Sequence, residues 1–246
     1  MFHSVGNRWH CCSKCNLNLI YYNIRNINVN FFINFAKHLE NHLKQIKNRT
    51  GDSDFSFISL IRFLHLAKPS DDNSSVIKIN NAKKSIFDEM YSFPFWPQDD
   101  SQYSGIWKNN KEMDKLVFWS ENHLLMTLTS CYLFSQYKWQ QLESKHAGAN
   151  DINIAYKKLT NSIETKILTK YLEVHCNEKF GGLYETNSFV YIPYSICALL
   201  NLIDFAVNPK IKELSRAIID NAVYRLMLGT TVDNGVCNLT GTYNAI

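Results

Sequence analysis

Residues 116–134, LVFWSENHLLMTLTSCYLF, lie within a run at 112–136 that favours helix and is apolar on nearly every side. A helix that is hydrophobic all round is surrounded by protein. Polar groups inside such a helix are costly unless each one is hydrogen-bonded. This segment therefore predicts a buried helix that carries a polar cluster, Ser120 to His123, in the interior of an all-α fold.

Helical periodicity continues on both sides of this segment, and nearly all-apolar runs alternate with amphipathic ones. That alternation is what a layer of inner helices wrapped by outer helices would produce. Strand-like patterns are limited to weak hints over residues 18–34. The sequence predicts an irregular segment at 1–30 and an all-α domain over 31–246, with helices at 31–47, 55–67, 75–91, 112–136, 151–174, 188–206 and 209–228.

Composition narrows the class of protein. With 46% hydrophobic and 13% aromatic residues in 246, the chain has ample material for a core, which excludes wholesale disorder. The net charge is only +4 and no Lys/Arg run occurs, so we expect no nucleic-acid partner. The apolar stretch at 17–36 is interrupted by Arg25 and several Asn residues, so we expect no membrane span. No secretory signal is visible, which makes a cytoplasmic location the default.

The seven cysteines are an odd set for a disulfide framework. Cys12 and Cys15 form a C-x-x-C pair beside Cys11 and His10, which is one half of a zinc-site pattern. A structural zinc site needs four ligands, and no second pair follows. We therefore expect reduced thiols, no metal and no cofactor.

The polar cluster in the apolar helix has two readings. In the first, Asn122 and His123 face a cavity together with Trp119, while Glu121 fixes a neighbouring helix. In the second, all these side chains belong to a satisfied polar network that only joins helices.

A second motif, FGGLYETNS at residues 180–188, combines two glycines with an exposed Tyr184-Glu185 pair ahead of a helix. Ser188 is a candidate N-cap. Tyr191 and Tyr194 are three residues apart and should share a face of that helix. Alternatively, Glu185 is only a carboxylate at a helix start and the tyrosines are core residues. Taken together, the two motifs supply His, Asn, Glu and Tyr groups that are typical of a carbohydrate-processing site.

These motifs, with ALLNLIDFA at 198–206, resemble a group of (α/α)-toroid proteins. That group is similar to six-hairpin glycosidases and to heparinase- and alginate-lyase-like polysaccharide lyases. The resemblance covers about residues 111–246. The predicted helices make roughly half of six hairpins, so we expect an incomplete toroid, a fragment whose apolar flanks favour self-association.

The resemblance implies a polysaccharide lyase that performs β-elimination on a uronate-containing polysaccharide. Asn122 would polarise the uronate carboxylate, His123 would take the C5 proton, and Tyr184 or Tyr191 would protonate the leaving oxygen. One alternative is a glycoside hydrolase that uses Glu121 and Glu185. Another is a non-catalytic helical scaffold. The candidate catalytic residues are Asn122, His123, Tyr184, Glu185 and Tyr191, and the candidate substrate-binding residues are Trp119, Glu121 and Tyr194.

Overall fold

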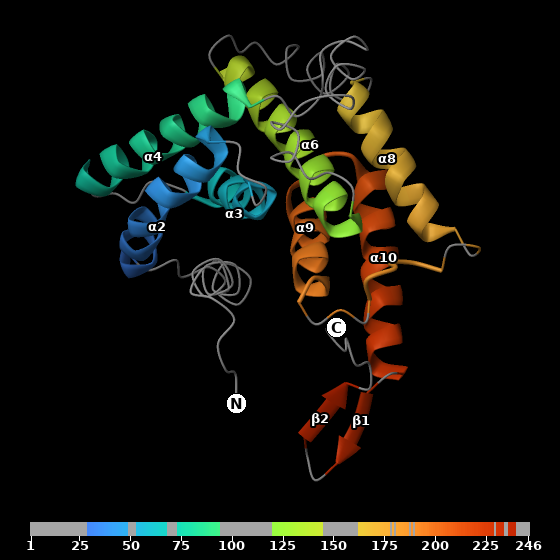
Figure 1. Cartoon of the computed structure of the whole chain (residues 1–246). Coiled ribbons are helices and arrows are strands. Elements are labelled where there is room, and N and C mark those ends of the chain that lie inside the picture. Colours follow the sequence, from blue (N-terminus) through green and yellow to red (C-terminus); the bar gives the residue numbers. More distant parts are fainter. Residues whose placement is uncertain are drawn as a thin grey trace, which may run out of the picture. The chain divides into compact units, whose positions relative to one another are not determined.

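The described part of the chain is almost entirely helical, which confirms the all-α fold class (Figure 1). The computed structural model describes residues 29–48, 53–67, 73–93, 120–144, 162–177, 179, 181–186, 188, 190–228, 230–233 and 236–239. The elements in these ranges are α2 (Val29–Lys47), α3 (Ser53–Leu66), α4 (Asn73–Ser92), α6 (Glu121–Ser144), α8 (Ile163–Cys176), α9 (Ile192–Phe205), α10 (Pro209–Leu228), β1 (Thr230–Asp233) and β2 (Val236–Leu239).

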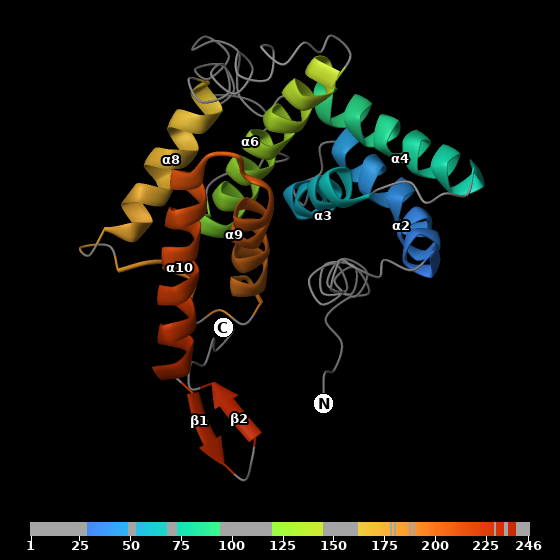
Figure 2. The same ribbon diagram turned by 180° about the vertical axis from the view of Figure 1, so that it is seen from behind.

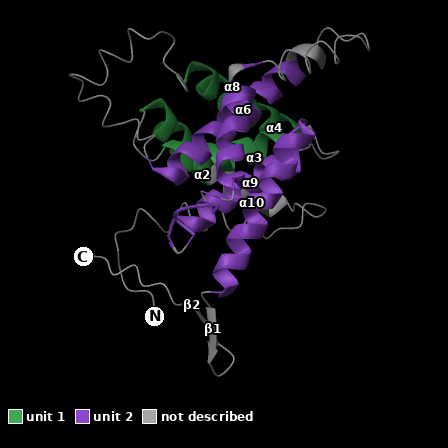
Figure 3. Cartoon of the chain, turned by 90° about the vertical axis from the view of Figure 1, so that its right-hand side faces the viewer, with its two compact units in different colours: residues 1–118 green, residues 119–246 purple. Residues whose placement is uncertain are grey.

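The chain divides into two compact units, residues 1–118 and residues 119–246 (Figure 3). The first unit contains α2, α3 and α4, and the second contains the other helices and the two strands. The irregular segment expected at 1–30 lies outside the described residues except for its last two positions, which begin α2. The extent of the domain expected over 31–246 stays a prediction.

In the first unit, α2 packs against α3 and α4, and α3 also contacts α4. The almost wholly apolar sequence of α3 is buried from Ser53 to Leu64, as its composition predicts. Phe57 meets Phe93 edge to face, with ring centroids 4.7 Å apart. Burial on all sides forces the polar residues of α3 to find partners within the protein.

One such partnership joins α2 to α3 through a buried histidine. Nδ1 of His42 lies 2.8 Å from Oγ of Ser56, and Ser56 Oγ donates to Oε1 of Gln45 at 2.5 Å. The single hydroxyl proton of Ser56 is thereby used, so Nδ1 of His42 must be the donor to Ser56. Burial, and secondly the charge of nearby His38, lower the pKa of His42 to about 4. His42 is therefore a neutral core histidine at physiological pH.

The second unit is built from two helical pairs (Figure 2). α6 packs on α9, α8 packs on α10, and further contacts join α6 to α8 and α9 to α10. α9 is buried along most of its length, whereas α10 buries one stripe at i, i+4, i+7 and i+11: Ile211, Ser215, Ile218 and Ala222. This difference matches the predicted alternation of inner and amphipathic helices.

Capping residues fix where two of these helices begin. Ser162 has an extended backbone, and its Oγ accepts the N–H of Thr165 at 3.2 Å, so α8 begins at Ile163. The helix predicted over 151–174 therefore starts later than expected, and residues 151–161 lie outside the described residues. Oδ1 of Asn208 accepts the N–H of Lys210 at 3.0 Å, which places Pro209 at the first helical position, as predicted.

A buried amide joins α6 to the turn between α9 and α10. Nε2 of Gln136 donates to the carbonyl of Phe205 at 2.8 Å, and its Oε1 accepts the N–H of Val207 at 2.9 Å. Both ends of the side chain are thus paired with backbone groups that the end of α9 leaves open.

The short antiparallel hairpin of β1 and β2 was not predicted. Thr230 pairs with Leu239 and Asp233 with Val236, which leaves a two-residue connection. That connection is Asn234-Gly235, the strongest short-range hairpin signal in a sequence. The weak strand hints at 18–34 were wrong where they can be compared, because α2 begins at Val29.

The neutral state of His42 predicts acid sensitivity. Because the pKa of His42 is lower in the folded chain than the ordinary 6.5, its contribution to the free energy of unfolding is complete above pH 6.5. That contribution is lost as pH falls toward 4. We expect about 3 kcal/mol less unfolding free energy below this window than above it. In His42→Asn the amide replaces the Nδ1 donor but cannot take up a proton, so this part of the pH dependence should disappear. Urea unfolding of both proteins at about pH 7 and pH 4.5 measures the difference, and an identical pH dependence in the two would contradict the assignment.

Candidate functional site

The predicted polar cluster lies at the start of α6 and not in its middle. Ser120 is outside the helix, and the N–H of Leu124 donates to the Ser120 carbonyl at 3.0 Å, the first bond of the helix. Glu121, Asn122 and His123 therefore form the first turn, where backbone N–H groups have no partner within the helix. The prediction of one continuous helix through 112–136 was wrong at this point. Trp119 and the residues that precede it from 112 lie outside the described residues.

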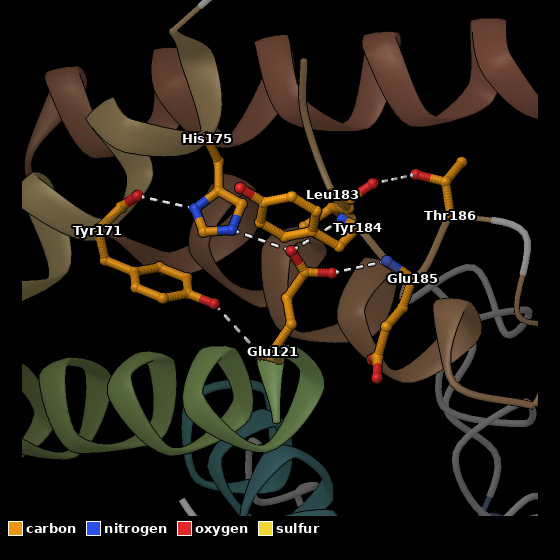
Figure 4. Close-up of polar contacts among 7 residues, drawn as sticks. All are labelled: Glu121, Tyr171, His175, Leu183, Tyr184, Glu185 and Thr186. Atoms are coloured by element: carbon orange, nitrogen blue, oxygen red, sulfur yellow. Dashed lines mark hydrogen bonds and ion pairs between the residues drawn. The ribbon is translucent and has the colours of Figure 1, made fainter. Parts of the chain in front are cut away.

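Glu121 accepts hydrogen bonds from three donors (Figure 4). Its Oε1 accepts the backbone N–H of Tyr184 at 2.9 Å and also lies 3.0 Å from Nε2 of His175. Its Oε2 accepts the backbone N–H of Glu185 at 3.0 Å. The side chain is only 8% exposed. One carboxylate thus joins the start of α6, the end of α8 and the loop before α9.

His175, in the last turn of α8, faces a hydrogen-bond acceptor at each ring nitrogen. Nδ1 lies 2.9 Å from the carbonyl of Tyr171, and Nε2 lies 3.0 Å from Oε1 of Glu121. A carbonyl and a carboxylate can only accept, so both nitrogens must carry a proton for both bonds to form. His175 is therefore a buried imidazolium, paired with Glu121 at a helix C-terminus, where a positive charge is favourable.

The pKa values of this pair shift in opposite directions. Burial alone would raise the pKa of Glu121, but the hydrogen bonds from His175, Glu185 and Tyr184 outweigh it and leave that pKa below its ordinary value. Burial would lower the pKa of His175, yet its bonds to Glu121 and to the Tyr171 carbonyl raise it. Each partner thus stabilises the charged form of the other.

Tyr171 completes the pair from the preceding turn of α8. Its hydroxyl donates to the backbone carbonyl of Glu121 at 3.2 Å, and its ring lies 4.4 Å from the ring of His175. Burial, followed by the charges of Glu121 and Glu185, raises its pKa, so the phenol stays protonated. Neither Tyr171 nor His175 was predicted as a site residue. Their i, i+4 spacing on an amphipathic helix nevertheless indicates that the two side chains share a helix face.

The carboxyl group of Glu185 also contacts the first turn of α6. It accepts the backbone N–H of Asn122, while its own N–H donates to Glu121. We call this exchange between Glu121, Asn122, Tyr184 and Glu185 the reciprocal clasp. Burial, and then the charge of Glu121, raise the pKa of Glu185. Among the described residues, its Oε2 is buried without a hydrogen-bond partner. The pKa values of the two carboxyl groups therefore shift in opposite directions, which is common at functional sites.

Two glycines position the loop of the reciprocal clasp on α10. Gly181 has φ +68° and Gly182 φ +92°, a backbone conformation that other residues rarely adopt. A Cβ on Gly182 would also collide with the side chain of Asn221, and one on Gly181 with that of Arg225. After this close approach Leu183 is buried, and the hydroxyl of Thr186 donates to its carbonyl at 2.6 Å.

The other predicted site residues differ widely in exposure. Asn122 is 1% exposed, its Oδ1 accepts from Ser120 Oγ at 2.5 Å, and its Nδ2 is buried without a partner among the described residues. His123 is half-buried, and its electrostatic interaction with the carboxyl group of Glu185 lowers the pKa of that group. Tyr184 is 70% exposed, close to the ring of His175, with centroids 6.4 Å apart.

The tyrosines after the loop do not share a helix face as predicted. α9 begins at Ile192, so Tyr191 lies in the turn before the helix, where it is half-buried. Ser188 caps that turn and not the helix, because its Oγ accepts the N–H of Tyr191 at 3.3 Å. Tyr194 is a buried residue of α9, with 6% of its surface exposed. The structure thus brings together Glu121, Asn122, Tyr184 and Glu185.

The described ranges contain neither a metal-ligand cluster nor a membrane-spanning helix. Within them, no three His, Cys, Asp or Glu residues are grouped so that they could hold a metal ion. Cys11, Cys12 and Cys15 lie outside these ranges, so the expectation about them stays a prediction. No described helix is both long enough and apolar enough to cross a membrane.

No protein family, curated protein or solved structure matches this chain. The function is therefore inferred from the geometry of the site.

The ion pair predicts that Glu121 is a stability residue. Glu121→Gln removes the charge opposite His175 and turns one acceptor atom into a donor that faces a donor, so we expect a loss of about 3 kcal/mol in unfolding free energy. Glu173→Gln is the matched control: this exposed glutamate of α8 pairs with Lys210, and its loss should change stability little. His123→Ala should also leave stability nearly unchanged. Urea unfolding of the three variants gives the comparison, and equal stabilities for Glu121→Gln and Glu173→Gln would refute the assignment.

Proposed function

We propose that this chain carries a carbohydrate-active site of the (α/α)-toroid type, in which Tyr184 and Glu185 contact the sugar. The observation that carries the proposal is the reciprocal clasp. It fixes the backbone of two consecutive residues, one with an exposed aromatic ring and the other with a carboxyl group of raised pKa. An aromatic ring can cover the apolar face of a sugar, and a raised pKa widens the pH range in which a carboxyl group has a proton to donate.

The packing of the second unit supports the toroid part of the proposal. In a ring of helical hairpins, inner helices contact inner helices and outer helices contact outer ones. α6 and α9 behave as such an inner pair, and α8 and α10 as an outer pair. The single buried stripe of α10 fits an outer position, and the extensive burial of α9 fits an inner one. The contacts of α6 with α8 and of α9 with α10 fit two adjacent units of such a ring.

We favour β-elimination as the reaction. His123 takes the C5 proton of a uronate, the electron pair forms the C4–C5 double bond, and the C4–O bond breaks as Tyr184 protonates the leaving oxygen. The raised pKa of Glu185 favours its protonated form, which donates a hydrogen bond to the uronate carboxylate and reduces its negative charge. The sequence-based prediction assigned this role to Asn122. We assign it to Glu185 because Asn122 is only 1% exposed.

The hydrolase alternative has less support from the geometry. It needs two carboxyl groups that are both free to act on the substrate. Both oxygens of Glu121 accept hydrogen bonds from within the protein, and its pKa is lowered, so it is a poor proton donor. Only Glu185 remains available of the proposed pair.

One observation favours the non-catalytic scaffold as a second candidate. The three donors of Glu121 are all internal, and Glu185 accepts from the first turn of α6 as a capping carboxylate would. A protein that only needed to hold its helices together could use the same contacts.

An assay against a panel of uronate-containing polysaccharides separates the three functions. Elimination leaves an unsaturated uronate that absorbs ultraviolet light, whereas hydrolysis yields reducing ends without that absorbance. We expect the unsaturated product, and a loss of at least ~100-fold in kcat/KM for Tyr184→Phe and for Glu185→Gln.

Tyr224→Phe and Glu173→Gln are the matched controls, because both residues are exposed and lie outside the reciprocal clasp. Their activity should equal that of the wild type. Reducing ends without absorbance would favour the hydrolase, and a wild-type protein that neither cleaves nor binds any polysaccharide would favour the scaffold.

A further inference from the structure

The side chain of His175 is only 7% exposed, yet the loop before α9 depends on it. Its Nε2 lies 3.0 Å from the same Oε1 atom of Glu121 that accepts the N–H of Tyr184. The side chains of both ion-pair partners are less than a tenth exposed, so water cannot readily replace either partner. The orientation of the Glu121 carboxylate is therefore set jointly by His175 and by the two loop amides.

We propose that His175 is a positioning residue whose doubly protonated ring, through Glu121, holds the backbone of Tyr184 and Glu185 in place. The loop geometry is then conditional on the protonation state of a histidine that never touches the ligand. The consequence for sugar binding rests on the proposed function, whereas the coupling between His175 and the loop does not.

A neutral imidazole has two tautomers, and neither can form both hydrogen bonds of His175. If only Nδ1 keeps its proton, the bond to the Tyr171 carbonyl remains, but the lone pair of Nε2 faces the carboxylate oxygen of Glu121 at 3.0 Å. If only Nε2 keeps its proton, the lone pair of Nδ1 faces the carbonyl at 2.9 Å. Each neutral form replaces one hydrogen bond by a repulsion in a buried place, where that is costly.

Loss of the proton also leaves Glu121 as a buried carboxylate without a cation. Its remaining donors would be the amides of Tyr184 and Glu185, which belong to a loop whose glycines lie close to side chains of α10. The electrostatic repulsion between Glu121 and Glu185 is then no longer offset by the charge of His175. The titratable or charged groups of this region are Glu121 and His123 on α6, Tyr171 on α8, Tyr184 and Glu185 on the loop, and Arg225 on α10 beside Gly181.

The direction of the pH effect is set by the raised pKa of His175. A histidine whose pKa is higher in the folded chain stabilises fully below its ordinary value of about 6.5. That contribution is lost as pH rises through the folded-state pKa. The loop is therefore held below about pH 6.5 and released as pH rises through the folded-state pKa of His175, the opposite of the response of His42.

Nuclear magnetic resonance of the full chain tests the coupling without any ligand. An amide proton bonded to a carboxylate resonates downfield, so the amide protons of Tyr184 and Glu185 report the bonds to Glu121 directly. As pH is raised from about 6 to about 9, we expect both to move upfield with the midpoint of the His175 ring protons, above 6.5. The amide of Val207, which donates to the uncharged Gln136, is the internal control and should not move with them.

Two matched variants identify the histidine responsible. In His175→Gln the side chain cannot titrate, so the shifts of both loop amides should become independent of pH. In His123→Gln, which removes the other histidine near Glu185, the titration should persist with an unchanged midpoint. If His175→Gln fails to fold, the wild type and His123→Gln together still decide the question.

The role of His175 would be overturned if the chemical shifts of the two loop amides did not change with pH in the wild type. It would also be overturned if His123→Gln abolished their titration. If cleavage is found, kcat/KM should fall on the alkaline side with the same midpoint as the amides. A normal amide titration in a protein without any activity would reject the proposed function and leave the positioning role intact.

Discussion

The carboxylate of Glu121 accepts hydrogen bonds from groups that are 54, 63 and 64 residues away along the chain. A buried carboxylate is unfavourable unless a cation and several donors surround it. The second unit meets this requirement with the end of α8 and with the loop before α9. The same constraint explains why His175 must be charged and why its neighbour Tyr171 stays neutral.

The reciprocal clasp follows the logic of a capping box but acts between distant segments. In a capping box, two residues of one helix start exchange side-chain and backbone hydrogen bonds. Here Glu121, from the first turn of α6, accepts two loop amides, and Glu185 of the loop accepts an amide of that first turn. A helix start and a loop thereby satisfy each other. The arrangement leaves the ring of Tyr184 exposed, which is why we place the candidate sugar contact there.

Much of the helical framework could be predicted from sequence periodicity, because each helix carries its own local pattern. α10 has the predicted bounds, and the burial of α3 follows from its composition. The start of α6 was missed because apolar residues on both sides of Ser120 continue the helical pattern across the break. The hairpin was missed although Asn234-Gly235 indicates it.

The candidate site was predicted only in part, for a different reason. The two motifs contained Glu121, Tyr184 and Glu185, and each was singled out. Their mutual contacts, and the roles of Tyr171 and His175, depend on side chains that meet across 50 or more residues. No periodicity in a single sequence encodes such pairs. The expected roles therefore changed: Asn122 became a buried residue, and Glu121 a residue that holds the loop.

The sequence separation within the reciprocal clasp also bears on the order in which the chain folds. Contacts between residues far apart in sequence require closure of a long loop, and its entropy cost must be met before the contact contributes. Helices with strong local patterns, such as α10, have no such cost and can form first. We therefore expect the hydrogen bonds of Glu121 to form late, after the folding transition state. Weakening them would accelerate unfolding and leave the folding rate nearly unchanged, so the site governs how long the second unit persists once it is formed.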